Sequence, residues 1–179
     1  ANELLLVNLL SERVTDLAAG LRDALRSGSD IQQGVVMSTA YSRDGKRVAV
    51  GYENGVTQVW NLGSKRVVTR GPIHTGPVMG LAFDADGIRV ASQSFGRYDN
   101  RSLSDVPGEM IVWSAEDGSR IASARPHAAM PKYAPISYSG ATFGRHYGQM
   151  QPEFHSETDL VVTTGDREVV VWNAASGQR

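Results

Sequence analysis

Three tryptophans each close a short apolar run, and each is followed by a polar residue and a turn. The runs occupy residues 57–61, 110–114 and 169–173, with tryptophan at positions 60, 113 and 172. A glycine-containing turn with a basic residue at its end follows each run, at 62–66, 115–120 and 174–179. The chain therefore repeats one kind of β-strand and one kind of turn, and its fold must accommodate that repetition.

A second repeated feature lies upstream of the first two tryptophans. Residues 40–49 match residues 82–91, and each stretch places an Asp-Gly dipeptide between two β-prone runs. This pattern predicts two β-hairpins. The two turns are about forty residues apart, which is the spacing typical of four-stranded propeller blades.

The stretch 73–83, followed by Asp86-Gly87, resembles the WD-repeat β-propeller family, and the resemblance extends over about 35–179. It implies an all-β fold: a partial propeller of about three blades, each a four-stranded antiparallel sheet. The sequence departs from the family where Asn, Ser and Asn follow the tryptophans in place of Asp. It also has Ile73 and Pro126 where a glycine usually precedes histidine.

The resemblance divides the chain into an N-terminal region, 1–34, and a partial propeller, 35–179, with blades at about 35–70, 73–124 and 127–179. In the second repeat the four strands are expected at 78–83, 89–94, 109–113 and 120–123. The last repeat ends at Arg179, before an outer strand can form.

Members of the family can carry a buried hydrogen-bond chain that joins a histidine, a serine or threonine, an aspartate and the tryptophan of one blade. The resemblance assigns these roles to His74, Ser92 and Trp113 in the second repeat and to His127, Thr163, Asp166 and Trp172 in the third. The first repeat has Asn54 and Trp60 but no matching histidine, and the aspartate slot of the second falls inside an insertion. Such a network satisfies buried polar atoms, so its implied role is structural.

Composition narrows the function. With 179 residues, 41% apolar content and a net charge of −1, the chain is typical of globular proteins, and its charge argues against nucleic-acid binding. The absence of cysteine excludes disulfides and thiolate metal sites and favours a reducing compartment, with the cytoplasm as default. No apolar run approaches the roughly 20 residues that cross a bilayer, and the N-terminus lacks a signal-peptide pattern.

The number of repeats conflicts with a closed ring. Closed propellers have about four to eight blades, whereas three tryptophan signatures supply at most three. Open strand edges would invite association. We therefore expect a piece of a longer protein, as the missing initiator Met at Ala1 also indicates, with the other blades in the parent or in a second chain. A ring formed by two copies stays open as a further possibility.

The N-terminal region shows a different period. Leucine or valine recurs at spacings of three and four residues, at Leu6, Leu10, Val14, Leu17, Leu21 and Leu25. This stripe predicts an amphipathic helix from about Glu3 to Arg26, ended near Gly28. The helix could pack against the propeller or a neighbouring domain, form a coiled coil, or bind a membrane surface.

Two insertions, at about 95–108 and about 128–157, interrupt the blade spacing. Long loops on a rigid scaffold often carry binding, and arginine and tyrosine are favoured at interfaces. The candidate partner-binding residues are therefore Arg97, Tyr98, Arg101, Arg145 and Tyr147. Either loop could instead be inert or could contact the missing blades.

No catalytic arrangement emerges. Three histidines and two glutamates of the third repeat fit no compact metal motif; they are His127, His146, His155, Glu153 and Glu157. Ser137 and Ser139 lie near His146 but lack a nucleophile elbow. We thus expect no metal, no cofactor and no enzyme activity, and a scaffold that binds proteins. The alternative is the regulatory sensor propeller of a larger signalling enzyme, a switch ATPase or a kinase.

Overall fold

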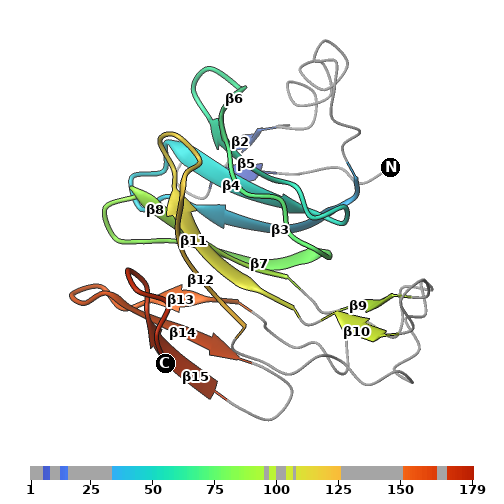
Figure 1. Cartoon of the computed structure of the whole chain (residues 1–179). Helices are drawn as coiled ribbons and strands as arrows, with labels where there is room; N and C mark the ends of the chain where they lie inside the picture. Colours follow the sequence, from blue (N-terminus) through green and yellow to red (C-terminus); the bar gives the residue numbers. More distant parts are fainter. Residues whose placement is uncertain are drawn as a thin grey trace.

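The computed structural model describes residues 34–94, 108–125, 151–164 and 169–179, and the backbone of four short strands outside those ranges. Three antiparallel sheets follow one another along the chain (Figure 1). Blade 1 contains β3 (Val36–Tyr41), β4 (Arg47–Tyr52), β5 (Thr57–Asn61) and β6 (Arg66–Arg70). Blade 2 contains β7 (Val78–Phe83), β8 (Arg89–Ser94), β11 (Met110–Ser114) and β12 (Arg120–Ala124). Blade 3 contains β13 (Glu153–Phe154), β14 (Leu160–Thr164) and β15 (Val169–Asn173).

This arrangement confirms the expected all-β, antiparallel fold. In blade 2 the first two strands have the expected bounds, the third is shifted by one residue, and the fourth is one residue longer than expected. β7 lies against β3 and β4, and β13 lies against β7, so the first strands of the blades lie next to one another.

The two Asp-Gly turns explain why these hairpins form. Gly45 and Gly87 have φ angles of 67° and 71°, a left-handed conformation that glycine adopts without steric cost. The N–H of Gly45 donates to the carbonyl of Ser42 at 2.9 Å, and the N–H of Gly87 donates to that of Asp84 at 3.1 Å. The turn chemistry predicted from the sequence is confirmed.

Two apolar cores lie between the blades. Blades 1 and 2 bury a cluster made of Ala40, Ala49, Val59, Val78, Leu81, Val90, Ile111, Trp113 and Ala115. Blades 2 and 3 bury Ala91, Met110, Val112, Ala122, Val161, Val170, Trp172 and Ala174. Each blade therefore contributes one face to each neighbour, and the third strands β5 and β11 are buried on both faces.

Hydrogen bonds from side chains to backbone carbonyls cross both interfaces. Ser38 Oγ donates to the carbonyl of Val78 at 2.7 Å, and Thr69 Oγ1 donates to that of Ala115 at 2.7 Å. Gln151 Nε2, just before β13, donates to the carbonyl of Leu81 at 2.7 Å. These bonds fix one blade relative to the next at both the inner and the outer strands.

The N-terminal region contains strands where a helix was expected. β1 (Leu6–Asn8) and β2 (Arg13–Thr15) pair antiparallel, so the helix predicted from Glu3 to Arg26 is wrong at these residues. Short apolar runs fit either a strand or a helix, and β-branched residues such as Val7 and Val14 favour the strand. The remainder of the predicted helix lies outside the described residues. No described helix is long and apolar enough to span a bilayer.

Candidate functional site

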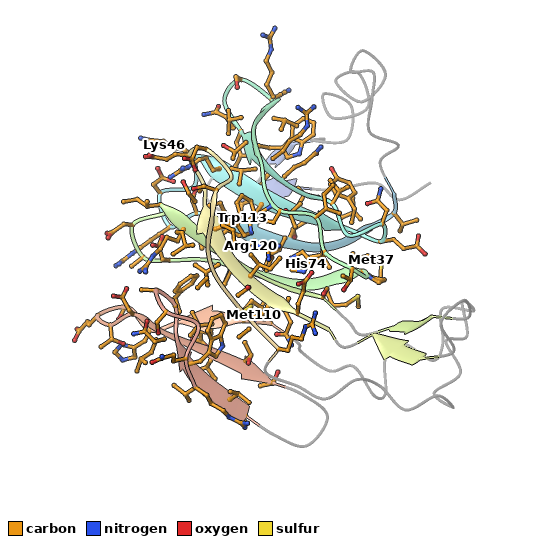
Figure 2. The ribbon with its side chains drawn as sticks, viewed as in Figure 1. Met37, Lys46, His74, Met110, Trp113 and Arg120 are labelled. Carbon is orange, nitrogen blue, oxygen red and sulfur yellow. The ribbon has the colours of Figure 1, made fainter. Side chains whose placement is uncertain are left out.

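Ser92 joins two other side chains in the interior of blade 2. It lies on β8, opposite Ile111 of β11. His74 Nε2 is 2.7 Å from Ser92 Oγ, and Trp113 Nε1 donates to the same oxygen at 3.0 Å. All three side chains are buried, and Figure 2 shows His74 and Trp113 inside the sheet assembly. The structure thus brings together the three residues that the resemblance assigned to this blade.

Glu109 lies on the far side of the His74 ring. Its Oε1 accepts the N–H of Thr75 at 3.2 Å and is 3.8 Å from His74 Nδ1. An indole N–H can only donate, so Ser92 Oγ accepts from Trp113, and its own hydrogen can go to His74 Nε2 at 2.7 Å or to the carbonyl of Ile111 at 3.3 Å. Donation to Nε2, the shorter contact, requires the imidazole hydrogen to be on Nδ1, which faces the Glu109 carboxylate beyond hydrogen-bond distance.

Glu109 was not among the residues that the sequence singled out. It follows the insertion and directly precedes β11, close to the place where the resemblance expects an aspartate. An acidic residue at the end of the insertion was the available indication, but its distance in sequence from His74 concealed it.

Burial sets the protonation state of His74 in this hydrogen-bond network. Burial, together with a smaller effect of the charge of Arg120, lowers the pKa of His74 from the ordinary 6.5 to about 3. His74 is therefore neutral near pH 7. Its approach to Glu109 is not an ion pair at that pH, and a neutral buried imidazole without access to solvent suits a structural role.

Blade 1 holds an apolar residue where blade 2 has Ser92. Val50 lies opposite Gln58, as Ser92 lies opposite Ile111. Trp60 Nε1 is buried and makes no hydrogen bond of ordinary geometry among the described residues, although the indole lies close enough to the Tyr52 hydroxyl to oppose the effect of burial on the pKa of Tyr52. Instead, Tyr52 donates its hydroxyl hydrogen to Gln58 Oε1 at 3.0 Å, and burial raises the pKa of Tyr52 to about 12.

Blade 3 repeats part of the arrangement. Thr163 occupies the position of Ser92 on the second strand, opposite Val170, and is buried. Trp172 is also buried, but its Nε1 has no partner in the described part of the chain. His127 and Asp166, the other two residues assigned to this blade, lie outside the described residues.

The first insertion forms a hairpin of its own. β9 (Arg97–Asp99) pairs with β10 (Ser104–Val106) and includes the candidate residues Arg97 and Tyr98; Arg101 lies outside the described residues. In Figure 1 this hairpin projects from the end of blade 2, away from the β8–β11 pair that leads into it. Arg97 and Tyr98 thus lie on a protruding element.

The second insertion is shorter than the sequence indicated. Glu153 and Phe154, placed in the insertion by sequence, form β13, the first strand of blade 3. Phe154 packs on the core between blades 2 and 3. A strand of two residues carries little periodicity, which is why the sequence did not reveal it. Arg145 and Tyr147 lie outside the described residues.

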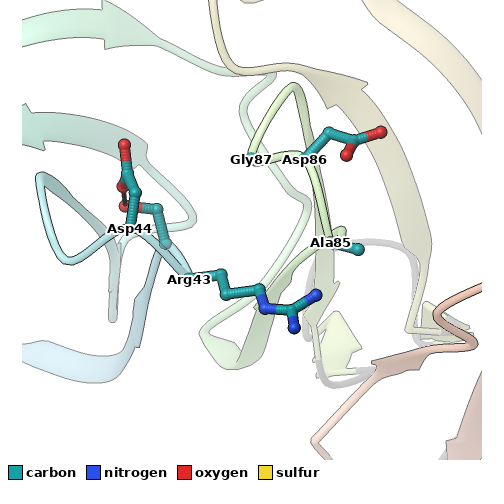
Figure 3. Close-up of a pocket in the computed structure, with 6 residues that line it drawn as sticks. Arg43, Asp44, Ala85, Asp86 and Gly87 are labelled. Carbon is teal, nitrogen blue, oxygen red and sulfur yellow. Dashed lines mark hydrogen bonds between the residues drawn. The ribbon is translucent and has the colours of Figure 1, made fainter.

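Two open pockets lie between turns of neighbouring blades. The first is lined by Ser42, Arg43 and Asp44 from blade 1 and by Ala85, Asp86 and Gly87 from blade 2. Figure 3 shows Arg43 extending from one turn toward the other. Tyr41, Arg43, Phe83, Asp84, Ala85, Phe154 and Ser156 line the second pocket. Ser42 Oγ donates to Asp44 Oδ1 at 2.6 Å, a bond within its own turn.

The described residues offer no metal-binding group of three histidine, aspartate or glutamate side chains. His155 Nδ1 lies 3.0 Å from Thr158 Oγ1 and accepts the N–H of Glu157 at 3.4 Å, so its ring belongs to the turn after β13. Neither pocket places a histidine beside a serine. The most developed features are a buried structural network and a protruding hairpin.

Comparison with known proteins points to repeat proteins. No protein-family model matches the chain. An uncharacterised WD repeat-containing protein of Schizosaccharomyces pombe is 25% identical over 135 residues, covering 75% of this chain and 18% of that protein. The U3 small nucleolar RNA-associated protein 12 of Saccharomyces cerevisiae is 35% identical over 92 residues, covering 49% of this chain and 10% of that protein. The chain thus spans less than a fifth of the length of these relatives.

Solved structures agree on the fold. The WD40 repeats of RRP9 superpose with a TM-score of 0.55 at 17% identity, covering 82% of this chain and 37% of that one. The C-terminal WD40 domain of Sif2 superposes with a TM-score of 0.53 at 17% identity, covering 78% of this chain and 31% of that one. Both superpositions cover about four-fifths of this chain and about a third of the other protein's chain.

Proposed function

Because this chain belongs to the WD-repeat β-propeller family, we propose that it acts as a non-catalytic scaffold that binds other proteins. The observation that carries this proposal is the hairpin β9–β10, which projects from a blade fixed by buried cores on both faces. A rigid support that presents a protruding element is suited to recognition, because little conformational freedom is lost on binding. Arg97, Tyr98 and Arg101 are the proposed contact residues, with Arg145 and Tyr147 as second candidates.

We also propose that further blades complete the ring next to blade 3. Val169 and Val171 on β15 are 64% and 47% exposed. Their equivalents in blade 2, Met110 and Val112, are fully buried against blade 3. A blade from the rest of a longer protein, or from a second chain, would cover this apolar face in the same way.

A second candidate concerns the assembly in which the scaffold works. The similarity to a U3 small nucleolar RNA-associated protein favours a role inside a ribonucleoprotein particle. With a net charge of −1, the chain would contact the protein components of such a particle rather than its RNA. A cytoplasmic location remains our proposal for the free-standing scaffold, and fluorescence imaging of the tagged protein separates the two.

The sensor of a larger signalling enzyme is the alternative from another class. It requires a catalytic module in the same polypeptide, with a phosphate-binding loop or kinase motifs. The sequence that flanks these residues in the genome tests it directly, because finding such motifs would favour the sensor over the scaffold.

The scaffold proposal is tested by separating binding from folding. The double variant Tyr98→Ala with Arg101→Ala should reduce recovery of protein partners in quantitative affinity purification and leave the unfolding midpoint unchanged. Trp113→Ala should lower the free energy of unfolding by about 3 to 5 kcal/mol, because it removes a fully buried ring. Equal loss of binding and stability in the two variants would contradict the division between hairpin and network.

A further inference from the structure

The turns that join the first and second strands of the three blades lie side by side at one end of the molecule (Figure 1). The two open pockets between them have volumes of about 180 and 260 Å³, and they adjoin at Arg43 and Ala85, which line both. We call the combined depression the turn groove; residues 41–44, 83–87, 154 and 156 line it. Because it crosses all three blades, it suits an extended ligand.

Aromatic side chains line the wider part of the turn groove. Tyr41, Phe83 and Phe154 each end the first strand of their blade, so one ring from every blade reaches the groove. Tyr41 is 46% exposed, whereas Phe83 and Phe154 are half-buried. The groove therefore offers apolar ring surface, and the Tyr41 ring is the most accessible of the three.

Asp84 is the acidic residue of this wider part, and its carboxylate is already engaged. Its Oδ1 accepts the backbone N–H groups of Ile88 and Arg89 at 2.8 and 3.0 Å, and its Oδ2 accepts Arg89 Nε at 2.8 Å. The residue is 7% exposed. Its negative charge is compensated within blade 2, so it opposes an anionic ligand little.

Arg43 is the cation among the residues that line the turn groove. Its exposed side chain lines both pockets, and its guanidinium makes no hydrogen bond or ion pair with the described residues. In Figure 3 it extends from the turn of blade 1 toward that of blade 2, while the carboxylates of Asp44 and Asp86 point elsewhere. Asp44 instead accepts the Ser42 hydroxyl at 2.6 Å and the N–H of Lys46 at 3.0 Å. The donors of Arg43 are thus available to a ligand.

The interface of blades 2 and 3 shows what a guanidinium binds at this end of the molecule. Arg89 begins β8, and its guanidinium carbon lies 5.5 Å from the ring centre of Phe154. The same side chain pairs with Asp84 of its own blade at 2.8 Å and with Asp159 of blade 3 at 2.7 Å. One ring and two carboxylates therefore surround it, an arrangement that suits a planar guanidinium.

Arg47 has the same position at the interface of blades 1 and 2 but lacks the carboxylates. It begins β4, and its guanidinium carbon lies 5.8 Å from the ring centre of Phe83. The backbone contacts of the turns align Ser42 and Ile88 with the two aspartates of the other interface, and Arg47 forms no ion pair with the described residues. A Cβ atom on Gly87 would lie 2.9 Å from Arg47 Nη2, so this guanidinium lies beside the turn groove.

We propose that the turn groove binds an acidic segment of a protein partner, with its carboxylates at Arg43 and Arg47 and an apolar side chain against the Tyr41 ring. The partner's carboxylates take the role that two aspartates of this chain have at Arg89, which favours carboxylates over phosphate groups. A guanidinium binds a carboxylate through two parallel N–H bonds.

This inference rests on the proposed scaffold role and adds a second surface to it. The turn groove lies at the start of β8, whereas the hairpin β9–β10 follows the end of β8. The two surfaces are at opposite ends of blade 2, so they can be tested separately.

Selection from a random peptide library tests the charge of the ligand without knowledge of the partner. Phage that display random short peptides are selected on the immobilised full chain and eluted with high salt, which screens charge pairs. We expect the enriched peptides to combine aspartate or glutamate with apolar residues. A selection without acidic enrichment would overturn the proposal.

Variants then locate the most enriched peptide, which is made synthetically and titrated by fluorescence anisotropy. Arg43→Gln should weaken its binding about five- to tenfold, the effect of losing one charge pair, whereas Arg70→Gln, at the exposed end of β6, should weaken it less than about twofold. Arg43→Glu should instead bind the peptide whose acidic residues are replaced by lysine. Urea unfolding checks that each variant is folded, and equal weakening in Arg43→Gln and Arg70→Gln would contradict the groove.

Two further outcomes would refute the proposal and separate it from the scaffold role. Tighter binding of a single-stranded oligouridylate than of the peptide, lost in Arg43→Gln, would assign the groove to nucleic acid. Loss of the peptide in Tyr98→Ala with Arg101→Ala, but not in Arg43→Gln, would place the peptide on the hairpin. In that second case the groove would be wrong and the proposed scaffold role would stand.

Discussion

Ser92 is the residue through which two buried polar side chains of blade 2 are satisfied. Its oxygen accepts the Trp113 indole and contacts His74 at 2.7 Å, with no exposed surface. Ser92→Ala leaves both nitrogens without this partner, so we expect the free energy of unfolding to fall by about 1 to 3 kcal/mol. Urea denaturation measures the change. Ser176→Ala, in an exposed turn, is the control, and an equal loss in the two variants would argue against the network.

The protonation of His74 gives stability a defined pH dependence. The pKa of His74 is about 3 in the folded chain, against an ordinary value of 6.5. The unfolded chain therefore binds more protons between these values, and stability falls as pH drops through that window. From pH 7 to pH 5 the loss from His74 is about 2 kcal/mol. Chemical denaturation at both pH values should show this loss and show less of it in His74→Gln; an unchanged pH dependence in the variant contradicts it.

A substitution in blade 1 can add a hydrogen-bond acceptor for a tryptophan, the opposite of its removal in blade 2. Trp60 Nε1 makes no hydrogen bond of ordinary geometry in the described structure, and Val50 stands where Ser92 stands in blade 2. Val50→Thr should supply an acceptor to the indole and raise the free energy of unfolding by about 1 kcal/mol. Thermal unfolding compares this variant with Val59→Thr, which places a hydroxyl on the opposite face and should destabilise. A loss at position 50 as large as that at 59 would show that the indole gains no bond.

At the scale of elements, Arg47 and Arg89, which begin β4 and β8, make different contacts with the following blade. Arg89 donates to Asp84 and Asp159 and covers Phe154, whereas Arg47 covers Phe83. Arg89→Met should therefore cost about 1 to 2 kcal/mol, and Arg47→Met about 0.5 to 1 kcal/mol. Hydrogen exchange should report faster opening of β14 and β15 in Arg89→Met. Uniform acceleration over all three blades would mean that the contact is not local to the interface.

The elements that the sequence predicted well are those in which several patterns agree. In blade 2 the Asp-Gly turn, the apolar runs and the tryptophan indicate the same register, and every strand was placed to within one residue. The predicted helix is wrong at β1 and β2, because short apolar runs fit either a helix or a strand and tertiary contacts decide between the two. Glu109 could not be assigned from the sequence, because it comes near His74 only when β11 pairs with β8 across the insertion.

At the scale of the whole molecule, blade 3 differs from blades 1 and 2 in the exposure of its third strand. β15 alternates between buried and exposed valines, whereas β5 and β11 are buried on both faces. An apolar strand face of this kind favours association between molecules. Val169→Lys with Val171→Lys should lower self-association without loss of stability, as measured by light scattering and urea unfolding. Val170→Lys, at a buried position, should unfold the chain. If the double variant lost as much stability as Val170→Lys, the face that contains Val169 and Val171 would already be covered.

The two blade interfaces join residues at different distances along the chain. Ser38 and Val78 are 40 residues apart and Thr69 and Ala115 are 46, whereas Gln151 and Leu81, like Arg89 and Asp159, are 70 apart. During synthesis, blades 1 and 2 can dock as soon as β12 has left the ribosome, while β15 is still unmade. The nascent chain thus forms its first interface early and holds the apolar side of blade 2 open until the long intervening segment has been translated. This interval is when a chaperone would have a surface to bind.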